Sequence, residues 1–242
     1  MITRFGLAVG LLMFSNVAFG DNYTRGFLYP IKGPQDKWIY VLNDHTIVNK
    51  DGTMSSEATF KDQEGKVVLT EKVKYTADGT ATDYIFDHSP AGETGRVTVD
   101  SDGTHFEYTK EGNKKTNTER VWDDFITGPS LKYYVKKHWD ELKSGKEIEG
   151  RFAALDRRET IKFLYKKVGT KKVGDVEGFT IEMKIKMPML RFLVDEIYLT
   201  YAENPFRIIE SKGRMVVKVF EDGKWKKQDY LVRYEHSEKP FK

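Results

Sequence analysis

Cysteine is absent from the 242 residues of the chain. A chain without thiols can form no disulfide bond, no zinc–thiolate site and no thiol nucleophile, and it cannot carry the lipid anchor of a lipoprotein. The stability of the fold therefore has to come from packing and from backbone hydrogen bonds. A chain of this length can bury a substantial core without cross-links.

Sequence motifs for catalysis are absent as well. The chain contains no G-x-S-x-G, H-E-x-x-H, P-loop or G-x-G-x-x-G pattern, and its five histidines share no spacing typical of metal ligands. We therefore predict no enzyme activity, no catalytic residue, no metal site and no cofactor. The formal net charge of +3 also predicts no binding of nucleic acid, because domains that bind it carry a strong excess of positive charge.

The N-terminus has the composition of a secretory signal peptide, with Arg4 followed by an apolar run at residues 5–14. This run is shorter than the ~20 apolar residues of a helix that crosses a membrane. Ala18 and Gly20 are the small residues that a signal peptidase recognises. We predict cleavage of residues 1–20 before Asp21, and a periplasmic or secreted protein that is not integral to the membrane. A retained N-terminal anchor is the alternative.

Residues 21–242 are predicted to form a single β-rich domain in two halves. In the first half, residues 21–121, short β-prone runs alternate with five acidic residue–glycine pairs, at 51–52, 64–65, 78–79, 102–103 and 111–112. Asp-Gly is the preferred pair in two-residue hairpin turns of type I′, because both central residues need a positive φ. The spacing predicts an antiparallel meander. Because these strands are polar and rich in threonine, we expect this half to be packed less tightly than the second.

The second half, residues 146–236, has a clearer strand signal. Residues 179–187 alternate apolar and polar side chains throughout, which is typical of an antiparallel strand with one face in water. The apolar faces of such strands either fill a packed core or line a ligand pocket. We predict a pocket, so that Met183→Ala causes a modest loss of stability and changes the binding of a lipid probe. The candidate lining residues are Phe163, Tyr165, Phe179, Ile181, Met183, Ile185 and Met187, together with His138 and Trp139 of the segment described next.

One long helix is predicted at about residues 129–144, as a pivot at residues 122–145 between the two halves. Apolar residues recur there with the spacing of one helix face, from Leu131 to Leu142. Pro129 suits the first turn of a helix, and Gly145 suits the left-handed position after the last turn. We expect Trp139 and Leu142 to be buried against the sheet. The residues expected to face water are Lys132, Lys136 and Asp140.

Two polar features have both a functional and a structural interpretation. His138 lies on the apolar face of the predicted helix, where it could contact a ligand, although a hydrogen bond to a backbone carbonyl is favoured. Arg157 and Arg158 are candidate anion-binding residues, because paired guanidinium groups bind carboxylate or phosphate in a bidentate manner. A charged hairpin tip would have the same sequence.

Residues 120–215 resemble a group of uncharacterised exported bacterial β-rich proteins. The resemblance rests on Phe125-Ile126, on the pattern His138-Trp139-x-x-Leu142-x-x-Gly145, on a strand that begins near Glu147, on the Arg-Glu-Thr run at 158–160 and on residues 191–195. It implies a secreted β architecture with an internal crossover helix. The group has no established activity, so no functional residue is transferred from it.

These observations predict a mainly β fold, an antiparallel and strongly curved sheet or incomplete β-barrel with one long crossover helix. A two-sheet sandwich is the alternative architecture. Export, the lack of a catalytic motif and the apolar strand faces favour a non-catalytic binding or carrier module for an apolar or amphipathic small molecule, such as a lipid. The alternative is an envelope-associated structural protein that contacts another envelope protein and has no small ligand.

Overall fold

The computed structural model describes residues 21–32, 35–189 and 195–242. The first eight strands are β1 (Asp21–Pro30), β2 (Tyr40–Val48), β3 (Met54–Lys61), β4 (Val67–Tyr75), β5 (Ala81–His88), β6 (Glu93–Asp100), β7 (Gly103–Lys110) and β8 (Asn113–Glu119). The others are β9 (Phe125–Ile126), β10 (Ile148–Ala154), β11 (Glu159–Val173), β12 (Val176–Ile185), β13 (Ile197–Ala202), β14 (Arg207–Glu221) and β15 (Lys224–Ser237). The helical elements whose bounds are described are the 3-10 turn η1 (Ser89–Ala91), α1 (Leu131–Lys137) and α2 (Trp139–Lys143). The predicted signal peptide and residues 191–194 lie outside the described residues.

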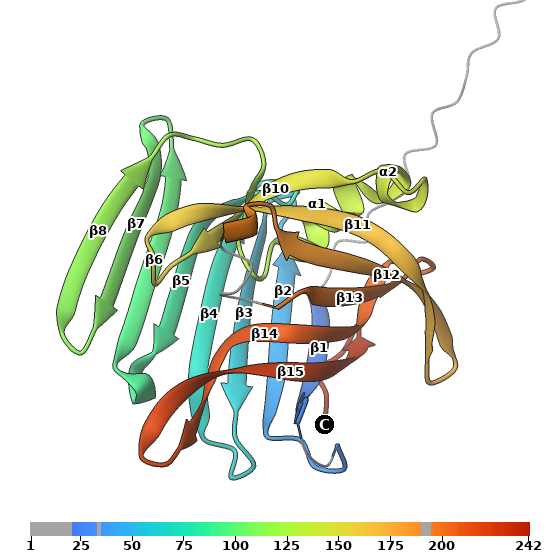
Figure 1. The fold of residues 1–242 in the computed structure, drawn as a ribbon, viewed down its shortest axis with the longest axis horizontal. Helices are drawn as coiled ribbons and strands as arrows, with labels where there is room; N and C mark the ends of the chain where they lie inside the picture. The colour runs from blue at the N-terminus through green and yellow to red at the C-terminus, as the bar shows by residue number, and fades with distance from the viewer. Residues whose placement is uncertain (1–20, 33–34, 190–194) are drawn as a thin grey trace, which may run out of the picture.

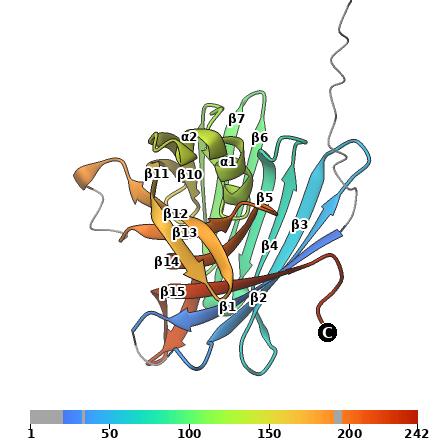
Figure 2. The same ribbon diagram turned by 90° about the vertical axis from the view of Figure 1, so that its right-hand side faces the viewer.

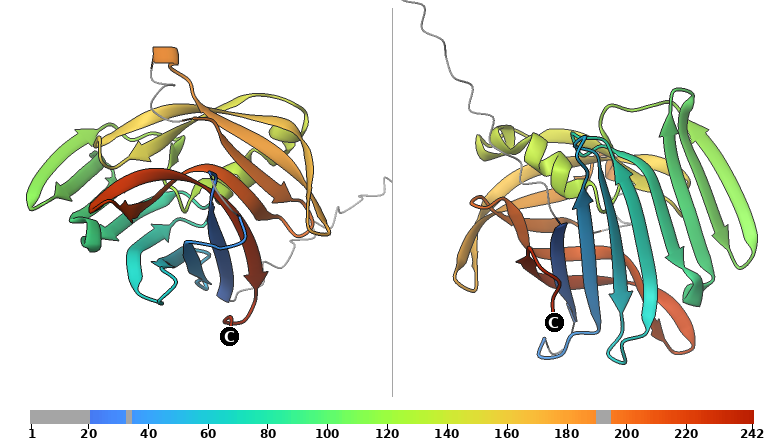
Figure 3. Two further views of the ribbon diagram at one scale, coloured as in Figure 1. Left: turned by 60° about the horizontal axis from the view of Figure 1, so that its bottom comes forward. Right: turned by 180° about the vertical axis from the view of Figure 1, so that it is seen from behind.

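All strands belong to one sheet, in the order β8-β7-β6-β5-β4-β3-β2-β1-β15-β14-β13-β12-β11-β10-β9. β1 pairs with β15, so the first and last strands of the described chain are neighbours at the centre of the sheet. The pairing of β9 with β10 is parallel, and the other neighbours are antiparallel. The sheet curves so strongly that β10–β15 arch over β1–β8, and it ends at β8 and β9 without closing (Figures 1 and 3). The prediction of a mainly β fold with a curved antiparallel sheet is confirmed.

Five acidic residue–glycine pairs lie in hairpin turns of two kinds, whereas in the pair Asp102-Gly103 the glycine is already the first residue of β7 and has a φ of 158°. Two pairs have a positive φ at both central residues, as type I′ turns require: Glu111-Gly112 at 50° and 79°, and Asp222-Gly223 at 52° and 73°. In three others, only the glycine has a positive φ, and its N–H bonds to the carbonyl three residues earlier: Gly52, Gly65 and Gly79. Glycine is therefore needed at every one of these turns, whereas the acidic residue adopts the left-handed conformation only in the first kind.

Two apolar clusters fill the inside of the curved sheet. The first joins β1–β7 to β14 and β15, and its most deeply buried residues include Leu28, Phe60, Leu69, Val97, Phe106, Val217, Tyr230 and Val232. The second joins the helices to β10–β13. Residues 21–121 supply many of the buried side chains of the first cluster, although Ile47, Val67 and Ile85 of the same half are exposed. The expectation that this half packs less tightly than the second stays a prediction.

The helical segment is interrupted at His138, whose φ of −104° and ψ of 19° separate α1 from α2. The predicted single helix is therefore two short helices in sequence. The first begins at Leu131, after Ser130, whose hydroxyl accepts a 2.8 Å hydrogen bond from the backbone N–H of Thr127. Gly145 has the predicted left-handed conformation, with a φ of 87°.

Two glycines allow α1 to lie between opposite sides of the sheet. A Cβ at Gly79, in the turn between β4 and β5, would lie 2.4 Å from the Cβ of Tyr133, and a Cβ at Gly150, in β10, would lie 2.9 Å from the Cζ of Tyr134. A side chain at either position would push the helix away. Tyr133 thus contacts the β4–β5 turn and Tyr134 contacts β10, so α1 lies between these two parts of the sheet (Figure 2).

Candidate functional site

An apolar stripe runs along the inner faces of β11 and β12. Five of the candidate lining residues are buried in it: Phe163, Tyr165, Ile181, Met183 and Ile185. Phe179 is half-buried at the margin of the same cluster. The prediction that Met187 is buried with them is wrong, because this residue is 56% exposed. β12 ends at Ile185, which is the last residue of the strand to pair with β11, so the alternation of the sequence continues beyond the strand itself.

The helices cover this stripe. Val135, Trp139 and Leu142 are buried in the second apolar cluster with the stripe residues, which confirms the prediction for Trp139 and Leu142. The ring of Trp139 packs edge-on against Phe179 and Phe206, with centroid distances of 5.7 and 5.0 Å. Helix residues therefore form part of the apolar surface that packs on the inner faces of β11 and β12.

Polar contacts fix the outer end of the helical segment. The indole Nε1 of Trp139 donates to a carboxylate oxygen of Glu203 at 3.3 Å, and Lys143 forms an ion pair with the same carboxylate. These hydrogen bonds, that of Lys143 first, lower the pKa of Glu203. His138 bonds through Nδ1 to Glu141 at 2.8 Å rather than to a backbone carbonyl, and its ring lies 4.8 Å from that of Tyr134. His138 is only partly buried and lies beside the apolar stripe rather than within it.

The stripe contains a buried polar group. The hydroxyl of Tyr165 has no hydrogen-bond partner among the described residues, although Tyr165 is completely buried. Burial, followed by the nearby Tyr134, Tyr201 and Asp124, raises its pKa far above the usual value, so the hydroxyl keeps its proton. The ring of Tyr134 from α1 lies 5.4 Å from that of Tyr165. A hydrogen-bond donor therefore lies directly under the helix.

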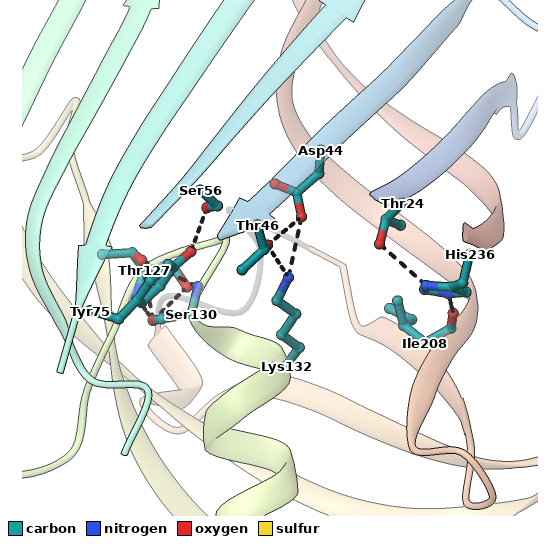
Figure 4. A network of polar contacts seen from close by, with 10 residues as sticks. All are labelled: Thr24, Asp44, Thr46, Ser56, Tyr75, Thr127, Ser130, Lys132, Ile208 and His236. Carbon is teal, nitrogen blue, oxygen red and sulfur yellow. Dashed lines mark hydrogen bonds and ion pairs between the residues drawn. The ribbon is translucent and has the colours of Figure 1, made fainter. Parts of the chain in front are cut away.

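On its other side, α1 is held by an ion pair that the sequence did not suggest. Nζ of Lys132 lies 3.2 Å from a carboxylate oxygen of Asp44 and 3.4 Å from the hydroxyl of Thr46, both in β2 (Figure 4). The prediction that Lys132 faces water is wrong: its side chain is 31% exposed and that of Asp44 15%. Burial lowers the pKa of Lys132, but the attraction of Asp44 and the nearby tyrosines outweighs burial and raises it. Lys136 and Asp140 are exposed, as predicted.

Further polar side chains lie beside this ion pair. The hydroxyls of Ser56 and Tyr75 are 2.8 Å apart, and Thr127 and Ser130 bond to each other at the start of α1 (Figure 4). Glu71, in β4, is buried nearby. Sequence analysis missed Glu71, but the alternation of Leu69, Glu71, Val73 and Tyr75 along β4 shows that all four share the inner face.

Arg157 and Arg158 lie apart from the apolar stripe, in the turn between β10 and β11. Nε of Arg157 lies 2.5 Å from the carboxylate of Glu159, and Arg158 donates to the carbonyl of Asp156 at 3.4 Å. Both are bonded within their own turn, as in the alternative interpretation of a charged hairpin tip. The described residues contain no cluster of three or more His, Cys, Asp or Glu side chains suited to a metal ion. None of the helices in the described part of the chain is long and apolar enough to cross a membrane.

Comparison with known proteins gives a likeness of fold. No family model and no curated protein matches the sequence. Among solved structures, the chain is similar to a β-barrel-like protein of the domain of unknown function DUF1849 from Brucella abortus, with a TM-score of 0.52 and 11% identity over 90% of this chain and 98% of that one. This likeness confirms the predicted resemblance to uncharacterised β-rich proteins at the level of the fold.

Two other structures are more distant. One is a domain provisionally described as an outer membrane lipoprotein-sorting protein from Vibrio parahaemolyticus, with a TM-score of 0.32 and 8% identity over 91% of this chain and 86% of that one. The other is a protein with a YmcC-like fold from Bacteroides fragilis, with a TM-score of 0.32 and 13% identity over 89% of this chain and 95% of that one. Neither score is high enough to support an argument about function.

Proposed function

We propose that the protein is an exported, non-catalytic module that binds an apolar or amphipathic ligand on the inner faces of β11 and β12. The proposal rests on the elements that pack against the apolar stripe. Val135, Trp139 and Leu142 of the two short helices are buried in the same cluster as the stripe, together with residues of β9, β10 and β13. Short helices held mainly by side-chain contacts separate from a sheet at a lower cost than strands held by a hydrogen-bond ladder.

The polar groups under and beside the helices support an amphipathic ligand. The unpartnered hydroxyl of Tyr165 lies on the stripe, and buried polar groups are normally hydrogen-bonded. A ligand that replaced the helix could accept a bond from this hydroxyl while its apolar part contacts Ile181 and Met183. Export is supported by the composition of residues 1–20, which is that of a secretory signal peptide.

The experiment uses a brominated fatty acid, dibromostearate, which quenches tryptophan fluorescence on contact. We expect saturable quenching in the purified protein. Most of it should disappear in Trp139→Phe, because Trp139 is the residue of α2 whose ring packs on Phe179 of β12. The matched control is Trp225→Phe, which removes a tryptophan near β5 and should leave the quenching intact. A parent protein that shows no saturable quenching, and yields no lipid on solvent extraction and mass spectrometry, would refute the proposal.

A further inference from the structure

The two longest neighbouring strands, β14 and β15, separate at one end. Their last paired residues are Glu210 and Arg233, although β14 begins at Arg207 and β15 continues to Ser237. His236 bridges the separation, since its Nε2 lies 2.6 Å from the carbonyl oxygen of Ile208 (Figure 4). A carbonyl can only accept, so Nε2 carries the proton, and Nδ1 accepts from the hydroxyl of Thr24 at 3.2 Å.

A cavity of about 220 Å³ lies at this separation. One part of its wall is apolar and is formed by Ile209 and by Val173 and Val176 at the tip of the β11–β12 hairpin. The charged part is formed by Arg207, Arg233 and Glu235. We call this cavity the strand-end cleft.

The two arginines of the strand-end cleft have little of their charge satisfied. Arg207 forms no ion pair with any residue that the structure describes. Arg233 has one contact with a carboxylate, 3.9 Å from Nε to Glu210, and Glu210 is already paired closely with Lys171. The guanidinium of Arg233 also lies 5.5 Å from the centroid of the Tyr29 ring. Glu235 is the one acidic residue of the lining, so the wall of the cleft has an excess of positive charge.

We propose that the strand-end cleft binds an anionic group, a carboxylate or a phosphate, that is attached to a short apolar chain. The planar guanidinium groups of Arg207 and Arg233 match the geometry of such an anion, and the apolar wall contacts the chain. This site is separate from the stripe on β11 and β12 and does not rest on the function proposed for it.

Calorimetric titration of the purified protein tests the proposal with three probes: octyl phosphate, inorganic phosphate and the neutral octyl glucoside. We expect octyl phosphate to bind and octyl glucoside not to bind. The double variant Arg207→Gln/Arg233→Gln should bind octyl phosphate about tenfold more weakly or worse, since charge-assisted hydrogen bonds are lost. Arg207→Lys/Arg233→Lys keeps the charge without the planar fork and should give an intermediate affinity.

Lys212→Gln is the control, because it removes one positive charge, half of what the double variant removes, from an exposed position of β14 outside the cleft. Comparable binding of inorganic phosphate would contradict the role of the apolar wall, and binding of octyl phosphate alone would support it. The proposal is overturned if octyl phosphate does not bind, or if the double variant melts like the parent and binds octyl phosphate equally well. It is also overturned if Lys212→Gln weakens binding to the same extent. Quenching of Trp139 by dibromostearate should be the same in parent and double variant, so this site and the apolar stripe are tested separately.

Discussion

The carboxylate of Glu71 accepts a 2.5 Å hydrogen bond from the hydroxyl of Tyr84 inside the curved sheet. Burial raises the pKa of Glu71 from 4.5 to about 7, against the lowering effect of the Tyr84 bond, and the negative charge of Asp44 adds to the rise. A carboxyl group whose pKa rises on folding binds its proton more tightly in the folded state. Its contribution to stability is therefore present at low pH and is lost as pH rises from 4.5 through about 7.

Glu71→Gln should remove this dependence on pH. Relative to the variant, the parent should lose about 3 kcal/mol of unfolding free energy between the unfolded and folded pKa values. Urea unfolding at a series of pH values measures the difference. Glu57→Gln, at an exposed position of β3 that pairs with Lys72, is the control and should keep the pH dependence of the parent. If the unfolding free energies of the parent and Glu71→Gln changed in parallel with pH, the prediction would be contradicted.

His88 should have the opposite effect. Its ring is completely buried, neither nitrogen has a partner among the described residues, and Trp225 lies 4.8 Å away. Burial lowers its pKa from 6.5 to about 4, so stability is lost as pH falls from 6.5 toward 4. His88→Phe keeps an aromatic ring and loses no hydrogen bond, so at pH 5 it should be about 2 kcal/mol more stable relative to the parent than at neutral pH. A parent and a variant that lose equal stability on acidification would show that His88 is not buried in its neutral form.

Docking of the helices should depend on Trp139. Truncation of this buried ring by Trp139→Ala should destabilise the fold by about 3–5 kcal/mol, because the contacts with Phe179 and Phe206 are lost. Lys136→Ala, on the exposed side of α1, should change stability by no more than about 0.5 kcal/mol. Thermal unfolding followed by circular dichroism measures both. A Trp139→Ala protein that melts like the parent would show that α2 is not docked on the sheet.

The Lys132–Asp44 ion pair holds α1 to β2, and removing one partner should cost more than removing both. Lys132→Met leaves Asp44 without its cation in a mostly buried position and should destabilise the protein by about 2–3 kcal/mol, somewhat less than in a fully buried pair. Adding Asp44→Asn should recover part of this loss. A double-mutant cycle measured by urea unfolding gives the coupling. Additive effects of the two substitutions would mean that the ion pair does not form.

Much of the fold was predictable because it depends on local signals. The acidic residue–glycine pairs marked the hairpins, and the alternation of residues 179–185 marked a strand with one buried face. The burial of Trp139 and Leu142 followed from helical spacing. Met187 could not be placed by the same argument, because only the pairing of β12 with its neighbours determines where the strand ends.

The errors at the candidate site have a common physical cause. A helical pattern shows which residues share a face, but it assumes that only one face is buried. Because α1 lies between two sides of the sheet, Lys132 on its polar face meets Asp44, which is distant in the sequence. The strand-end cleft could not be predicted from local patterns either. Arg207 and Arg233 line one cavity only because β14 and β15 separate beyond Glu210. The role of the stripe residues as a ligand-binding surface remains a prediction.

Leu142→Ala and Met183→Ala together distinguish a ligand-binding stripe from a packed core. Both side chains are buried in the second apolar cluster, so each truncation should cost about 2–5 kcal/mol. For Met183, this exceeds the modest loss expected from the sequence, because its side chain is buried in the same cluster as the helix residues Val135, Trp139 and Leu142. Their effects on the affinity for dibromostearate should differ. Leu142→Ala weakens the packing of the helices on the stripe, so less free energy is needed for a ligand to displace them. The affinity should therefore rise up to tenfold for each 1.4 kcal/mol of docking energy removed.

Met183→Ala removes part of the surface that the ligand would contact, so any gain from looser packing should be offset by lost contacts, and its affinity should fall below that of Leu142→Ala. Val168→Ala is the control, because Val168 is an exposed residue of β11 and its truncation should leave both stability and affinity unchanged. Titration of the three variants and the parent by tryptophan quenching provides the comparison. If Leu142→Ala and Met183→Ala are equally destabilised and neither differs from the parent in affinity, the stripe is core alone, and the helices are a structural element rather than a cover.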